Sequence, residues 1–384
     1  NDGKVYRTIC IGTQEWVADN LVETKYRNLD AIPEVIPNAT WTALSTGARC
    51  SYNNDPGNAN PTCTGFAFTS KTQLQTAVDL WISNESSAIA TYGQINTWCT
   101  GAITDMSDLF KNKQTFNDDI SNWDVSNVTD MSDMFYDARA FNQNIGSWDV
   151  SSVINMENMF WGASVFNGDI GSWDVSSVTN MREMFYETDA FNQPIGVWDV
   201  SSVTNMSGMF KFNLYSVPVF NQPLNNWDVS SVTNMKQMFT GHDAFNQPIN
   251  SWDVSNVANM IGMFWYNSGF NQNIKDWDVS SVTDMSWMFR EATAFNNGGV
   301  TGIGSWNVSS VTNMEYMFEG ANSFNQDIGA WDVSSVLNRN NMRYMFNRAT
   351  IFNQDLTGWC VTNIPSEPID FSASSALTSV NEPV

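Results

Sequence analysis

The chain has 384 residues and a formal net charge of −23, from 40 acidic and 17 basic residues. This balance argues against a protein that binds nucleic acid or an anionic membrane surface, because phosphate binding relies on Lys and Arg. There is no run of about 18 or more apolar residues, so the sequence predicts no transmembrane segment.

Residues 1–66 form the first predicted region, a small β-rich or irregular N-terminal cap. The chain begins at Asn1 with neither an initiator Met nor an apolar leader, as a processed secreted chain does. Residues 67–91 are predicted to form a capping helix and linker. Between Ser70 and Trp81 the apolar residues share one helical face, which predicts an amphipathic helix that seals the first repeat. That face carries Leu74, Ala77, Val78 and Trp81.

Five cysteines are compatible with an oxidising compartment. Cys50 and Cys63 bracket a loop rich in Asn, Gly and Pro, and we predict a disulfide between them because it would pin a segment with little core. Cys10, Cys99 and Cys360 remain. Since their number is odd, at least one of them is free, paired with another chain, or missing a partner.

From residue 92 to residue 361 one unit recurs, with the consensus Phe-Asn-x-x-Ile-x-x-Trp-Asp-Val-Ser-x-Val-x-Asn-Met-x-x-Met-Phe and a commonest spacing of 25 residues. A unit this short cannot bury its own apolar side, so the units must stack as rungs and share one core. We predict about eleven rungs, followed by a C-terminal cap or tail over residues 362–384. The repeat tryptophans are Trp98, Trp123, Trp148, Trp173, Trp198, Trp227, Trp252, Trp277, Trp306, Trp331 and Trp359.

Each unit reads as a strand followed by a helix. The strand centres on Trp-Asp-Val, where alternate side chains such as Trp123 and Val125 point inward. The helix begins at an N-cap such as Asp130 and has apolar residues at i, i+3, i+4 and i+7. The sequence therefore predicts a right-handed, leucine-rich-repeat-like α/β solenoid with one short parallel strand and one short helix in each rung of about 25 residues. In one unit the two apolar patterns are Ile120, Trp123, Val125, Val128 and Met131, Met134, Phe135, Ala138.

Two further columns have structural interpretations. All 19 methionines lie on the predicted helix stripe. Their inward spacing beside Phe predicts core packing, and the alternative is a soft-metal or adaptable binding surface. The Asn that follows each leading Phe, such as Asn117 and Asn142, predicts an interior ladder that bonds backbone amides of neighbouring rungs.

An aspartate column leaves two interpretations open. Its carboxylates would lie about 4.8 Å apart in neighbouring strands and repel one another. Either the Ser hydroxyls and turn amides that follow each Asp compensate, in Asx-type turns, or calcium ions bind between rungs as the one candidate cofactor. The column is interrupted only by Asn307. The candidate calcium ligands are Asp124, Asp149, Asp174, Asp199, Asp228, Asp253, Asp278 and Asp332.

Insertions break the period within residues 210–220, 296–306 and 336–342. Insertions map to loops, and loops carry specificity. Aromatic residues beside the predicted helices either form a binding ridge or merely cover the helix ends. The candidate binding residues are Trp161, Trp265, Tyr266, Trp287, Tyr316, Tyr344, Phe212 and Tyr215.

The sequence predicts no catalytic residues. Its single histidine, His242, has no set of partners for acid–base or metal chemistry. Glycoside hydrolysis needs two carboxyl groups with separated pKa values in one cleft, and a uniform aspartate column offers no such asymmetry. We therefore do not expect an enzyme.

The motif Trp-Asp-Val-Ser-Ser-Val-Thr-Asn-Met recurs almost unchanged along the array. Through it, residues 66–377 resemble the bacterial surface-protein repeat family with BspA-like leucine-rich repeats. The resemblance implies an exported or surface-displayed protein used in attachment, without catalytic residues. The motif stands at residues 173–181, 198–206 and 227–235.

The first 66 residues resemble the start of the Fibrobacter succinogenes major paralogous domain. The resemblance rests on residues 8–21, residues 26–33 and Trp41. It is partial, because the second half of that domain is missing.

Stacked rungs present long regular faces instead of one deep pocket, which favours contact along a surface. We expect an extracellular, non-catalytic protein that binds a protein or glycan ligand on another surface through its repeat face and insertion loops. The alternative is a structural subunit that assembles head to tail into an extracellular fibre or surface layer, because open ends of a stack can join.

Overall fold

A computed structural model describes residues 8–11, 14–17, 63–213 and 216–383 of the chain. The chain divides into two compact units, Asn1–Cys63 and Thr64–Val384. In the first unit, strands β1 (Thr8–Ile11) and β2 (Gln14–Val17) form an antiparallel pair in which Ile9 lies opposite Trp16. The other residues of the first unit, except Cys63, lie outside the described part of the chain.

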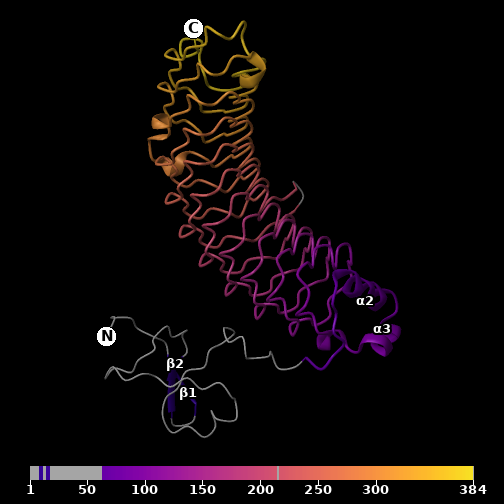
Figure 1. The fold of residues 1–384 in the computed structure, drawn as a ribbon. Coiled ribbons are helices and arrows are strands. Elements are labelled where there is room, and N and C mark those ends of the chain that lie inside the picture. The colour runs from indigo at the N-terminus through magenta and orange to yellow at the C-terminus, as the bar shows by residue number, and fades with distance from the viewer. Residues whose placement is uncertain (1–7, 12–13, 18–62, 214–215, 384) are drawn as a thin grey trace. The chain divides into compact units, whose positions relative to one another are not determined.

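The second unit begins with two helices, α2 (Lys71–Ser83) and α3 (Glu85–Tyr92), drawn in indigo in Figure 1. The side chain of Ser70 accepts a hydrogen bond from the Gln73 amide, which satisfies a donor that the first helical turn leaves unpaired. The predicted amphipathic helix is confirmed, because α2 buries the face that the sequence indicates. Its buried residues are Leu74, Ala77, Val78 and Trp81.

Helix α2 covers the first rung. The side-chain amide of Gln75 donates to the carbonyl oxygen of Leu109 at 3.1 Å, and the Trp81 ring packs edge-on against Trp98 with centroids 5.8 Å apart. The helix therefore satisfies a backbone acceptor and buries apolar surface that a preceding rung would otherwise cover, as terminal caps of repeat arrays do.

Beyond α3 the chain forms stacked coils that follow one another in sequence order, as the colours of Figure 1 show. From Asp105 to Asn313, a single parallel bridge joins successive rungs at the residue before the first Met, for example Asp130 with Asn155. The predicted strand-plus-helix rung is wrong. Within described residues 95–361 there is no α-helix and no strand longer than an isolated bridge, so the leucine-rich-repeat-like α/β solenoid does not describe this fold. The 3-10 elements there are η1 (Ile95–Thr97), η2 (Asn297–Gly299), η3 (Ile303–Ser305) and η4 (Arg339–Met342).

The Met-x-x-Met-Phe segment is a series of turns instead of a helix. In a helix its amides would bond four residues back within the segment. Instead, the amides of Met131, Asp133 and Phe135 donate to carbonyl oxygens of the next rung at 3.0, 2.8 and 2.9 Å. Asp133 and Asp137 have left-handed backbones, with φ of 56° and 53°. Because left-handed residues interrupt the right-handed ones, alternate amides point toward the next rung.

The left-handed backbone conformation recurs at the position of Asp133 in other rungs. The bonds between rungs stabilise this conformation, and it does not require a particular residue type. A left-handed backbone costs a residue other than Gly about 1–2 kcal/mol. Gly208 and Gly262 fill this position in two rungs, but Glu183, Trp287 and Tyr316 fill it in others, with φ of 51°, 65° and 58°. The bonds to the next rung offset the strain, since straightening the backbone would leave those amides without their partners.

The Trp-Asp-Val segment is also a turn. The amide of Trp123 donates to the carbonyl oxygen of Ile120 at 3.1 Å, and the amide of Val128 donates to the carbonyl oxygen of Val125 at 2.9 Å. These groups are satisfied inside the rung, so they form no strand ladder. The predicted inward direction of Trp123 and Val125 is nevertheless right, because both are buried.

The core consists of continuous columns of side chains. Trp227 and Trp252 stack at 6.4 Å, and Trp252 and Trp277 at 6.5 Å, with planes within 6° of parallel. The repeat tryptophans therefore point inward, as the sequence predicts for Trp123. The phenylalanines form two further columns, and rings such as Phe135 and Phe141 also stack at 3.9 Å within one rung. All 19 methionines are buried, which confirms their predicted packing role.

The C-terminal residues continue the stack. The amides of Tyr344 and Phe346 donate to the carbonyl oxygens of Ile369 and Phe371 at 2.9 and 2.8 Å. Residues 369–373 thus pair with the preceding Met segment as a further rung would, and Phe371 joins the core. Within the described ranges, no helix is both long and apolar enough to cross a bilayer.

Candidate interaction surfaces

A row of aromatic side chains follows one edge of the stack, and in three successive rungs it lies directly after the core phenylalanine. Tyr136, Trp161 and Tyr186 hold this position in successive rungs, and their ring centroids lie 4.3 and 5.0 Å apart with planes within 6° of parallel. The ammonium groups of Lys111 and Lys211 lie 5.1 and 5.3 Å from the two outer rings, at cation–π distance. We call these five side chains the first aromatic stack.

A second aromatic stack lies further along the array. The ring of Trp287 is 4.7 Å from that of Trp265 and 5.1 Å from that of Tyr316. Tyr316 in turn stacks on Tyr344 at 4.8 Å. The guanidinium of Arg290 lies 4.5 Å from the Trp287 centroid and 4.9 Å from that of Tyr316. The second aromatic stack comprises Trp265, Tyr266, Trp287, Arg290, Tyr316 and Tyr344.

Ion pairs accompany both stacks. Arg182 pairs with Glu157 at 2.6 Å, and Arg343 pairs with Glu315 at 2.9 Å. Arg290 forms a close pair with Glu319, whose carboxylate is buried. An acidic chain thus places several of its few cations along this one edge.

The ring faces in the first aromatic stack are already occupied. In the first stack each aromatic face contacts a neighbouring ring or a lysine, so the half-buried side chains present mainly their edges to solvent. Burial, assisted by the nearby Glu187 carboxylate, raises the pKa of Tyr186 to about 12. Its hydroxyl therefore stays protonated at neutral pH and can donate a hydrogen bond.

The insertion within residues 210–220 separates the two stacks. Phe212 turns inward, is buried and meets the ring of His242 edge-on at 5.0 Å. Further along the insertion Val217 is 80% exposed. Val197, outside the insertion, is 79% exposed, and single exposed apolar side chains of this kind are common on protein surfaces.

His242 is a core side chain. It is fully buried, and neither ring nitrogen has a hydrogen-bond partner in the described part of the chain. Burial lowers its pKa to about 3, so the imidazole is neutral at physiological pH. Its ring fills space between phenylalanines, among them Phe212 and Phe245.

The asparagine column lies on the surface. The side-chain oxygen of Asn142 accepts from the Asn167 amide at 2.9 Å, and that of Asn167 accepts from the Asn192 amide at 3.0 Å. The predicted bonding to neighbouring backbone amides is confirmed. The predicted interior placement is wrong, because these asparagines are exposed or half-buried.

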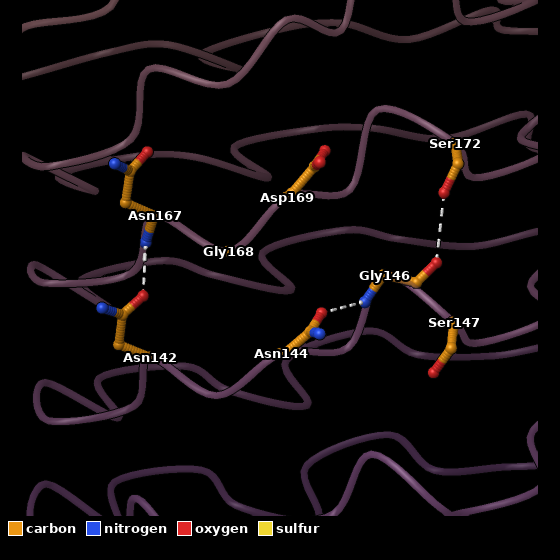
Figure 2. Close-up of a pocket in the computed structure, with 8 residues that line it drawn as sticks. All are labelled: Asn142, Asn144, Gly146, Ser147, Asn167, Gly168, Asp169 and Ser172. Atoms are coloured by element: carbon orange, nitrogen blue, oxygen red, sulfur yellow. Dashed lines mark hydrogen bonds between the residues drawn. The ribbon is translucent and has the colours of Figure 1, made fainter. Parts of the chain in front are cut away.

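A polar hollow of about 450 Å³ opens in the asparagine column between two rungs (Figure 2). Asn142 and Asn167 lie one above the other along one side of it, joined by the hydrogen bond drawn in Figure 2. Gly168 follows Asn167, and Asp169 and Ser172 line the hollow from the same rung.

The aspartate column forms Asx turns. The Oδ1 atom of Asp199 accepts from the Ser201 amide at 3.0 Å and from its hydroxyl at 2.6 Å. The hydrogen bonds from Ser201 hold the pKa of Asp199 below its usual value. Asn307 makes the equivalent pair of bonds to Ser309. Among the described residues no cluster of three or more His, Cys, Asp or Glu side chains is arranged to hold a metal ion, and calcium on this column stays a prediction.

Comparison with protein-family models gives four overlapping matches to a family described as "Mycoplasma protein of unknown function, DUF285". The matched residues are 81–192, 164–215, 212–301 and 277–380. The chain belongs to the DUF285 repeat family. The match is thus to a repeat family, but not to the BspA-like leucine-rich-repeat family that the motifs suggested. Neither the search of curated proteins nor that of solved structures found a match.

Sequence reasoning found part of the aromatic edge of the DUF285 repeats. It missed Tyr136 and Tyr186, although both directly follow a core Phe, as Trp161 does, and this shared position was the available signal. Phe212 is buried instead of exposed, and Tyr215 lies outside the described residues. The other candidate binding residues all belong to the aromatic stacks.

The cysteines of this DUF285 chain are in different states. Cys63 and Cys99 are disulfide-bonded. Cys50, the partner that the sequence predicts for Cys63, lies outside the described residues. Cys360 is an exposed free thiol.

Proposed function

We propose that this chain is an extracellular, non-catalytic recognition or adhesion protein, and that its two aromatic stacks and the insertion between them bind another protein. The observation that carries the proposal is the composition of this edge. Tyr, Trp and Arg are concentrated there, and these residue types supply most of the binding energy at protein interfaces.

A protein partner fits the edge better than a glycan. Aromatic side chains bind sugars through their faces, but the faces in the first stack are covered by neighbouring rings and lysines. Ring edges, tyrosine hydroxyls and guanidinium groups remain for contact. These groups suit the apolar anchors and hydrogen-bonded rims of protein interfaces.

One observation supports an extracellular location. Cys63 and Cys99 are disulfide-bonded, and disulfides persist mainly in oxidising compartments.

The alternative of head-to-tail assembly is less favoured by the first rung. Continuation of rungs from one molecule to the next needs an open face at each end. Helix α2 occupies that face at the first rung, where Gln75 bonds to Leu109 and Trp81 packs on Trp98. A preceding copy would have to displace α2.

Binding of the labelled, purified chain to cultured cells, to immobilised extracellular-matrix proteins and to a glycan array tests the proposal. Trp161→Ala and Tyr316→Ala should each weaken protein or cell binding by at least about tenfold, because anchors concentrate interface energy. Val217→Asp should weaken it too. Val197→Asp is the matched control, because Val197 is 79% exposed and Val217 80%, and only Val217 lies in the insertion.

Three results would contradict the proposal. One is binding to glycans alone. Another is equal loss of binding in Val197→Asp and Val217→Asp. The third is the appearance of long filaments of the purified chain by electron microscopy, with no binding to cells or proteins, which would replace recognition by the building-block function.

A further inference from the structure

In most rungs a glutamine follows the ladder asparagine and folds back on the preceding rung. The Nε2 atom of Gln193 donates to the carbonyl oxygen of Asn167 at 2.9 Å and to its Oδ1 at 3.0 Å. Each such asparagine therefore presents two acceptor atoms at the right separation to receive one amide nitrogen. The same pair of bonds, at 2.9–3.1 Å, is made by Gln222, Gln272, Gln326 and Gln354.

Three rungs lack this glutamine, because Asp118, Gly168 and Asn297 stand in its place. Of these, Gly168 has no side chain and follows an asparagine that stacks on Asn142. Asn142 thus keeps the pair of acceptors without the side chain that would occupy them. In the described part of the chain no group donates to the Asn142 carbonyl oxygen, and its Oδ1 accepts only from the Asn167 amide. The hollow of Figure 2 opens at this place, and Asn142, an exposed residue, lines it.

The walls of the hollow select a polar ligand. All residues that line it are Asn, Asp, Ser or Gly, so no apolar side chain lines it. The carboxylate of Asp169 and the carbonyl and side-chain oxygens of Asn142 are acceptors. They would repel a carboxylate or a phosphate, as would the net charge of −23.

We propose that this hollow is a binding site for a primary carboxamide, the side chain of a glutamine on a partner protein. Its NH2 group would donate to the carbonyl oxygen and Oδ1 of Asn142, as Gln193 donates to Asn167 one rung later. Two hydrogen bonds from one nitrogen give the site a geometric preference for an amide over a hydroxyl, which has a single donor. The site is separate from the aromatic stacks and does not depend on them.

The test is an NMR titration of the isotope-labelled full chain with the peptide Gly-Gln-Gly. Gly-Glu-Gly is the isosteric control, because it replaces the NH2 group by an oxygen. We expect the backbone signals of Asn142 and Gly168 to shift with Gly-Gln-Gly, and Gly-Glu-Gly to bind at least about tenfold more weakly. Gly168→Gln should abolish these shifts, because the chain's own amide then fills the site.

A second variant makes the test independent of any strain at residue 168, where an added Cβ would lie 3.0 Å from the Phe166 ring. Gln193→Gly should expose the acceptors of Asn167 and create a second site, seen as new shifts at Asn167 and twice the bound peptide. Failure of Gln193→Gly to gain a site, or equal binding of the Gln and Glu peptides, would overturn the proposal. So would tighter binding of Gly-Lys-Gly, which would identify a cation site.

Discussion

The regular rung of Phe135 and the extended rung of Phe210 differ in length but share one pattern of bonds. The amide of Phe135 donates to the next rung at 2.9 Å, and that of Phe210 does so at 3.0 Å. Four extra residues separate Phe210 from Phe220, relative to Phe135 and Phe141. The extra length increases the ring separation within the rung only from 3.9 to 4.5 Å.

This comparison shows which bonds specify the stack. Inter-rung backbone bonds and the core columns hold the register, so a loop can grow between two columns at small cost, because the entropy of loop closure rises slowly with length. The packing beneath the loop does change. Where the regular rung has Ala138, the rung after the insertion has His242, which packs against Phe212 of the inserted loop.

The largest expected effect comes from the tryptophan column. Trp148 and Trp227 are both buried, and each donates its indole N–H to a carbonyl of the preceding rung, at 3.2 and 3.0 Å. Trp148→Ala and Trp227→Ala should each lower the free energy of unfolding by about 3–5 kcal/mol, measured by denaturant titration. If the insertion leaves the column intact, the two losses should agree closely. A clearly smaller loss for Trp227→Ala would show that the extended rung is loosely packed.

Acid should destabilise the rung that packs on the insertion more than a regular rung, through His242. Its folded-state pKa of about 3 lies below the ordinary 6.5, so the unfolded chain takes up the proton first as the pH falls. The stability that the buried, neutral His242 contributes to the folded chain is therefore lost progressively as the pH falls from about 6.5 to about 3. Between about pH 7 and pH 4.5 the loss should be roughly 2–3 kcal/mol.

The control for this prediction is His242→Asn. In the next rung Asn267 occupies the equivalent position, and its Oδ1 accepts from the Phe270 amide at 2.9 Å. The variant should fold and should lack the extra acid sensitivity. Unfolding curves at the two pH values give the difference, and parallel losses in both proteins would contradict the role of His242.

The smallest effect is expected in the aspartate column. Asp199→Asn should change the free energy of unfolding at neutral pH by no more than about 0.5 kcal/mol, because Asn307 already makes the same two bonds. The bonds to Ser201 lower the pKa of Asp199 in the folded chain below its usual value of 3.8. The ionised carboxylate therefore stabilises the fold above pH 3.8, and this stabilisation is lost as the pH falls through the lowered pKa. The variant should therefore be slightly less acid-sensitive.

A chelator should leave the melting midpoint unchanged if the Asx turns alone satisfy the column. Thermal unfolding with and without chelator measures this. A fall of many degrees would instead show that calcium binds the folded state, because a ligand that binds only the native form stabilises it. Regular and extended rungs would then be held together by ions as well as by backbone bonds.

The sequence by itself determined which repeated apolar side chains form the core. Repeated Trp, Met and Phe at constant spacing specify the core columns, and the pattern from Leu74 to Trp81 specifies α2, because burial follows directly from the positions of apolar residues. It did not determine the backbone of the rungs. Apolar residues at i, i+3, i+4 and i+7 face inward in a helix, and they also face inward in turns with left-handed residues such as Asp133.

Only the tertiary structure decided between these backbones, because the deciding bonds join amides to carbonyls about one repeat away in the sequence. The interaction surfaces depend on the same register. Tyr136, Trp161 and Tyr186 touch only once the rungs are stacked. In the same way, the substitution at Gly168 opens a site only because the stack places Asn142 beside it. Local composition supplies the groups, and non-local hydrogen bonding brings them together.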